Sequence, residues 1–137
     1  MNYFRIALAA VAAFATYFIL GGLSFKLFPS LREEFLKYPT VYRPQDTMMR
    51  VMPAGMAAMF VSIAALAVLY ALLYQGGSGA LEGIRFGALI GIYSVGSFVV
   101  HNYVNLNIGL KLTVQQGVAY FVQWTIVGLV IGLIYRR

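Results

Sequence analysis

Residues 51–81 read VMPAGMAAMFVSIAALAVLYALLYQGGSGAL, a stretch of 31 residues without a single Asp, Glu, Lys or Arg. An apolar run of about 20 residues is long enough to cross the hydrocarbon core of a bilayer as a helix. Three more charge-free blocks cover residues 6–25, 86–110 and 112–135. All 14 charged residues fall outside these four blocks, which predicts a protein that crosses the membrane four times.

The composition excludes a soluble fold. Hydrophobic residues make up 61% of the chain and charged residues only 10%, whereas soluble domains carry about 25% charged residues. The net charge is +6, but the basic residues lie at span ends and in one loop, where they anchor to lipid headgroups. We therefore expect a lipid bilayer as partner and no nucleic acid. The absence of cysteine excludes a thiolate nucleophile and a Cys-ligated metal.

The chain is predicted to form a single transmembrane domain, residues 1–137, with an all-α four-helix bundle. The expected spans cover residues of about 6–25, 47–74, 83–106 and 113–134, and the loop 26–46 joins the first two. In that loop the run from Ser30 to Glu33 fits a capping box, which predicts a short interfacial helix over residues 31–37. Pro53 is expected to bend the second span.

Glycines spaced four apart mark where two of the spans should pack. They fall at the start of the third span and the end of the fourth: Gly83, Gly87, Gly91, Gly128 and Gly132. Such ridges let helices approach closely in a membrane. The third and fourth spans are antiparallel neighbours, so the start of the third and the end of the fourth lie at the same depth in the membrane. The two glycine ridges are therefore predicted to face each other.

Uncharged polar residues mark the opposite half of the same two spans. In the third span Ser94, Ser97, His101 and Asn105 recur at steps of three, four and four, which places them on one helical face with Asn102 beside it. His101 lies about 15 Å of helix before Lys111, at about 1.5 Å per residue. An ionisable group one to two turns below the interface is a functional candidate by default.

The fourth span carries a matching polar face. Gln116, Tyr120 and Gln123 recur at steps of four and three, and they start at the depth where the third span ends. We expect a polar pocket in one leaflet, roofed by the first loop. Its candidate ligand-binding residues are Ser97, His101, Asn102, Asn105, Gln116, Tyr120 and Gln123.

Three interpretations of this polar cluster stay open: a hydrogen-bonded structural cluster, a ligand-binding site, and a site of proton transfer. Ser, Asn, Gln and His side chains serve as interhelical glue in membranes, at about 0.6 kcal/mol for an average hydrogen bond. The same groups suit a small lipophilic ligand such as a quinone or a lipid, or a haem or chlorophyll ligated by His101. No cofactor and no metal are the default expectation, because the chain has one histidine and no acid in any span.

The acids argue against an enzyme. Glu33, Glu34 and Asp46 lie near or above the interface, and Glu82 lies on the opposite side. No acid pair at depth and no nucleophile beside a base is found. The expectation is therefore a protein without catalytic residues.

Location and orientation follow from the basic residues. The side of the first loop carries six of them, Lys26, Arg32, Lys37, Arg43, Arg50 and Lys111, against four on the side of the termini, Arg5, Arg85, Arg136 and Arg137. The positive-inside rule then favours a cytoplasmic loop by a narrow margin, so the orientation stays open. A multi-pass protein of the cell inner membrane is expected, since no segment resembles a mitochondrial presequence.

The chain also resembles a family of small bacterial four-helix membrane proteins defined only as a domain of unknown function. The likeness rests on residues 18–25, on Leu27-Phe28-Pro29, and on residues 87–91, 101–103 and 128–132. The chain departs from the family at Ser24-Phe25, where Trp-Tyr is usual. The resemblance implies a four-helix bundle and supplies no function.

Two functions remain as hypotheses. The first is a non-catalytic accessory subunit of a larger membrane assembly, with protein partners along its helices. The second is a stand-alone or homo-oligomeric binder or transporter of a small lipophilic molecule in the pocket around His101.

Overall fold

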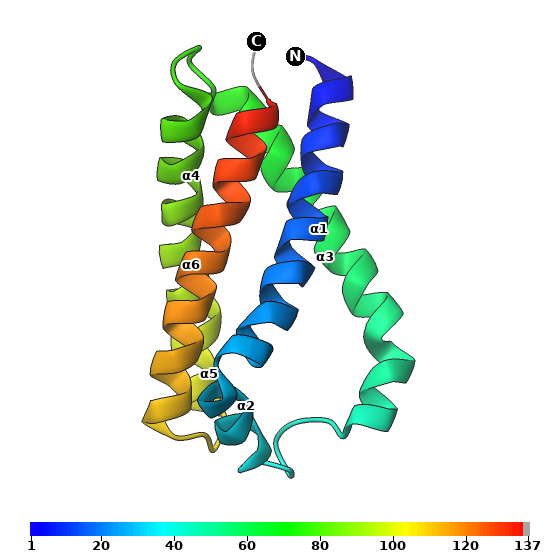
Figure 1. Ribbon diagram of the computed structural model, residues 1–137, viewed down its shortest axis with the longest axis vertical. Helices are drawn as coiled ribbons and strands as arrows, with labels where there is room; N and C mark the ends of the chain where they lie inside the picture. Colours follow the sequence, from blue (N-terminus) through cyan, green and yellow to red (C-terminus); the bar gives the residue numbers. More distant parts are fainter. Residues whose placement is uncertain (136–137) are drawn as a thin grey trace.

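Four long helices run the length of the molecule in the computed structural model, which describes residues 1–135 (Figure 1). They are α1 (Tyr3–Leu27), α3 (Gln45–Leu73), a third span that joins α4 (Gly79–Ser94), η1 (Val95–Val100) and α5 (His101–Asn105), and α6 (Leu110–Ile134). Each is long and apolar enough to span a membrane. The predicted all-α four-helix bundle is therefore confirmed. Arg136 and Arg137 of the charge count lie outside the described residues.

The helices are neighbours in the order α4, α6, α1 and α3, so α6 and α1 form the middle of the molecule. The N-terminus and the end of α6 lie at the same end of the molecule as the turn between α3 and α4 (Figure 1). The short helix α2 (Pro29–Leu36) and the turn between α5 and α6 lie at the other end. Each long helix begins two to four residues before the expected span, because the hydrogen-bonded helix extends into the interfacial region.

Glycine brings the backbones of α4 and α6 into direct contact. A Cβ atom added to Gly83 would lie 2.6 Å from the carbonyl oxygen of Gly128, and one added to Gly87 would lie 2.5 Å from that of Trp124. A Cβ on Gly132 would collide with the carbonyl oxygen of Gly79. At Gly91 the nearest atom is the ring of Phe121, 3.0 Å away. The two glycine runs thus face each other at the end of the molecule that holds the termini.

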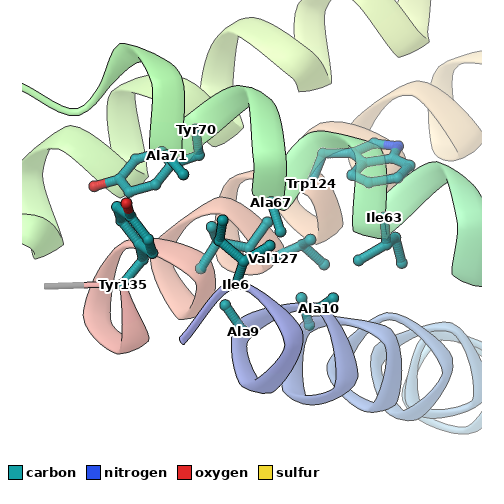
Figure 2. Close-up of a cluster of buried hydrophobic side chains, with 12 residues drawn as sticks. Ile6, Ala9, Ala10, Ile63, Ala67, Tyr70, Ala71, Trp124, Val127 and Tyr135 are labelled. Atoms are coloured by element: carbon teal, nitrogen blue, oxygen red, sulfur yellow. The ribbon is translucent and has the colours of Figure 1, made fainter. Parts of the chain in front are cut away.

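The main apolar core lies at this same end (Figure 2). Small residues line the contact between the first two spans, with Ala9 and Ala10 of α1 facing Ala67 and Ala71 of α3. Val127 and Ile131 of α6 complete it and are almost fully buried. Packing of alanines lets helices approach closely where the bilayer supplies no hydrophobic driving force.

Helix α3 leaves the bundle toward the loop end. Phe14 of α1 and Phe60 of α3 still meet edge to face, with ring centroids 5.4 Å apart. Between residues 45 and 62, however, every side chain except Thr47 and Met59 is exposed. Figure 1 shows the two helices diverging over this stretch. The buried core residues of α3 begin at Ile63, and of the preceding stretch Met59 packs against the core.

The expected interfacial helix is present, but its start differs from the prediction. The capping box from Ser30 to Glu33 is wrong, because α2 begins at Pro29 with Phe28 as N-cap and no side-chain capping bond. Proline fits the first turn of a helix, since its fixed φ is helical and it lacks the N–H that would be left unpaired. Ser30 therefore lies inside the helix, where its hydroxyl contacts α6 instead.

Candidate functional site

The polar face of the third span is interrupted by a π-helical segment. Ser94 precedes η1 and is buried, and its Oγ accepts a hydrogen bond of 3.0 Å from Nε1 of Trp124. A π turn bonds i to i+5 and so holds an extra residue, which rotates the following residues about the helix axis. Ser97, His101 and Asn105 are consequently exposed, and Asn102 is half-buried. The spacing of these residues along the sequence predicts that they share a helical face with Ser94, but in the structure they do not lie on that face.

The two glutamines of the α6 polar face point in a different direction, toward α1 and the first loop. Gln123 is buried, and its Nε2 donates to the carbonyl oxygen of Tyr17 at 2.6 Å. Gln116 is also buried, and its Nε2 lies 3.5 Å from the hydroxyl of Tyr42. The ring of Tyr120 stacks on Phe98 with centroids 5.4 Å apart.

The seven candidate residues therefore form two groups. Gln116, Tyr120 and Gln123 stay on the inner side of α6, as their spacing predicts, whereas Ser97, His101 and Asn105 lie on an exposed surface with the half-buried Asn102 beside them. The hydroxyl of Ser97 donates to the carbonyl oxygen of Tyr93 at 2.7 Å, so this serine is satisfied within its own helix. The ligand-binding role of each residue stays a prediction.

The first loop docks on the start of α6 through a second, smaller core. Leu31 of α2 packs with Ile108 and Leu112, and all three are buried. The hydroxyl of Tyr38 accepts a hydrogen bond of 2.8 Å from the backbone N–H of Gly109. These contacts fix the loop over the α1–α6 pair.

An ion cluster reinforces this docking. The carboxylate of Glu34 lies 2.6 Å from the ammonium of Lys37 and 2.9 Å from that of Lys111. The hydrogen bonds from Lys37 and Lys111 hold the pKa of the Glu34 carboxyl below its ordinary value. The hydrogen bond between Lys37 and Glu34 raises the pKa of the Lys37 ammonium. Sequence reasoning missed this cluster because its lysines come from two separate segments, and their spacing along the chain carries no signal.

Two cavities flank the α1–α6 contact beneath α2. The larger, of about 500 Å³, lies between the end of α1, the start of α2 and the first half of α6. The smaller, of about 290 Å³, lies on the other side and is lined by Tyr17, Phe35, Gln116 and Tyr120 among others. The wall of the larger cavity has a helical period in the sequence, since Leu20, Ser24 and Leu27 share one face of α1. This helical spacing is the signal in the sequence from which the cavity wall could have been predicted.

Neither a group of metal ligands nor a known relative is found for the described part of the chain. Residues 1–135 contain no group of three or more His, Cys, Asp or Glu side chains that could hold a metal ion. Comparison with protein-family models, curated proteins and solved structures finds no match to this chain. The family resemblance thus stays an expectation, and a function has to be argued from the geometry of a four-span helical membrane protein.

Proposed function

We propose that this protein is a non-catalytic accessory subunit of a larger membrane assembly, and that the first half of α3 is the surface that holds its partner. The observation that carries the proposal is the exposure of every side chain in residues 45–62 except Thr47 and Met59. A span that serves only to cross the membrane has no need to leave its own bundle over half its length.

The residue types on this segment support a protein partner. Residues 53–58 read PAGMAA, and a Cβ added to Gly55 would meet nothing within 4 Å. Small residues are typical of helix contacts in membranes, because they let a second helix come close. Met48, Met49 and Met52 precede this run, Met56 lies within it, and all four are exposed. Methionine adapts its shape to a partner surface because its side chain is unbranched and flexible.

The exposed polar residues of the third span give independent support. Intramembrane polar and ionisable side chains usually face protein or a water-filled cavity, because exposure to lipid is costly. His101 and Asn105 lie at an exposed surface near the end of the helix. A partner that covers them would remove this cost.

The second hypothesis, a lipophilic ligand bound around His101, receives less support. Such a pocket needs Gln116 and Gln123 to face His101, but both amides donate hydrogen bonds toward α1 and the first loop. The accessory role accounts for the exposed His101 without this requirement.

Site-specific photo-crosslinking in native membranes tests the proposal. A benzoylphenylalanine at Met52 or Ala57 of α3 is expected to form an adduct of one defined mass, and that partner should co-purify stoichiometrically in mild detergent. The same probe at Leu89, which is 66% exposed on α4, serves as the control and should give no such adduct. Crosslinks from α3 to lipid only, or to a second copy of this chain only, would overturn the proposal.

A further inference from the structure

The larger cavity forms a groove on the outer surface of the α1–α6 pair. Leu27 of α1 and Val118 of α6 line it and are 60% and 62% exposed, so it opens toward the surrounding bilayer. Its volume of about 500 Å³ falls in the range of about 300 to 1,000 Å³ that is typical of small-molecule sites. Any occupant reaches it sideways from the membrane.

The groove is apolar toward the middle of the membrane. Leu20, Val118 and Val122 line this end. The two polar residues at this end of the groove already form hydrogen bonds within the protein. The hydroxyl of Ser24 donates to the carbonyl oxygen of Leu20 at 2.8 Å, and the amide of Gln123 donates to the carbonyl oxygen of Tyr17. This part of the groove suits a hydrocarbon chain.

Hydrogen-bonding capacity is available at the opposite end, under the first turn of α2. The Oγ atom of Ser30 accepts a bond of 2.8 Å from Nε2 of Gln115, so its own hydroxyl proton is free to donate outward. The backbone N–H of Ser30 lies at this end too, in the first turn of α2, because Ser30 lines the groove. The positive end of a helix favours a negative group.

Lys111 places a positive charge about one helical turn from Ser30. Lys111 lies one turn before Gln115 on α6, and Glu34 lies one turn after Ser30 on α2. Two bonds therefore join the helices side by side: Gln115 to Ser30 at 2.8 Å and Lys111 to Glu34 at 2.9 Å. Lys37 binds the same carboxylate, which leaves two ammonium groups against one acid. The Lys111 side chain is 64% exposed, and an ammonium has three donors, so it can bind an anion together with Glu34.

We propose that this groove is a binding site for one phospholipid, with an acyl chain along α1 and α6 and the phosphate at Ser30 and Lys111. The groove and a phospholipid have the same order of apolar and polar parts. The apolar end of the groove faces the membrane centre, and its hydrogen-bond donors and positive charge face the interface. This site lies outside α3, so it goes beyond the accessory role and does not depend on a protein partner.

Native mass spectrometry of the purified protein tests the site with two probes of equal chain composition. Palmitoyl-oleoyl phosphatidylglycerol is expected to stay bound at one molecule per chain, and the corresponding diacylglycerol, which lacks phosphate, is expected to bind at least about tenfold more weakly. In Val118→Trp the indole fills the groove, so the phospholipid should be lost. Val11→Trp is the matched control, since Val11 is exposed on α1 outside the groove, and it should retain the lipid.

A second pair of variants tests the phosphate end without filling the groove. Ser30→Ala combined with Lys111→Gln should reduce the preference for phosphatidylglycerol over diacylglycerol about tenfold, and Lys111→Arg alone should keep it. Equal binding of both probes to the native chain would overturn the proposal. Equal retention of phosphatidylglycerol by Val118→Trp and Val11→Trp would also overturn it.

Discussion

At Gly87 one added methyl group would lie 2.5 Å and 2.7 Å from the carbonyl oxygens of Trp124 and Thr125. Both are backbone atoms of α6, so neither side can yield by rotating a side chain. We expect Gly87→Ala to lower the free energy of unfolding by about 1 to 3 kcal/mol, the usual cost of overpacking. Denaturant unfolding in mixed micelles, followed by circular dichroism, measures it.

The control for this prediction is a glycine in an open position. A Cβ at Gly22 of α1 would meet nothing within 4 Å, so Gly22→Ala should leave the free energy of unfolding unchanged or raise it slightly. If both substitutions had the same effect, the loss at Gly87 would not come from the α4–α6 contact.

Trp124 and His101 differ in what they contribute to the isolated chain. Trp124→Phe removes the hydrogen bond from the indole N–H to the hydroxyl of Ser94, and such a bond in a membrane protein is worth about 0.6 to 1.7 kcal/mol. His101 is exposed, so His101→Ala should change the free energy of unfolding by less than about 0.5 kcal/mol. The same micelle assay compares them. An equal loss in the two variants would mean that His101 has an internal partner.

At the scale of elements, Glu34 links the docking of α2 to pH. Because the folded pKa of Glu34 is lowered from its ordinary value of 4.5, its contribution is complete above pH 4.5 and is lost as the pH falls through the folded value. We expect α2 to loosen from α6 over that range. A spin label at Arg32→Cys measures its mobility, and the chain has no native cysteine to interfere.

The matched variants separate this carboxylate from its neighbour. Glu34→Gln should make the label mobile already at neutral pH, because the amide cannot form the two ion pairs with Lys37 and Lys111. Glu33→Gln should have no effect, since Glu33 is exposed on the same helix. Mobility that does not change with pH in the native chain would contradict the role of Glu34.

The elements also show which parts of the structure were predictable. Gly83 and Gly128 could be paired from sequence because a regular α-helix keeps residues four apart on one face. The same rule failed for His101, because η1 intervenes between Ser94 and α5 and nothing in the sequence VGSFVV signals a π turn. The divergence of α3 was also not predictable, since an apolar residue facing lipid and one facing a partner look alike in a sequence.

At the scale of the whole molecule, the two ends differ in how they are held together. The end with the termini is closed by the glycine contact and the alanine-rich core. The loop end is joined by α2, the Glu34 cluster and side-chain hydrogen bonds from α6, while α3 stands apart (Figure 1). The rigid end thus supports two surfaces at the loop end, one proposed for a partner and one for a lipid.

Because each span crosses the membrane once, the start of α1 and the turn between α3 and α4 lie on the side opposite the first loop, and this can be tested with single cysteines. Asn2 and Ser78 lie at one end of the molecule and Thr40 and Asn107 at the other, and all four are exposed. Since more basic residues lie on the loop side, the positive-inside rule predicts that side to be cytoplasmic. A membrane-impermeant maleimide added to intact cells should therefore label Asn2→Cys and Ser78→Cys, and should label Thr40→Cys and Asn107→Cys only after permeabilisation. The reverse pattern would contradict the orientation but not the fold, whereas labelling of Asn2→Cys and Ser78→Cys from different sides would contradict the four-span topology itself.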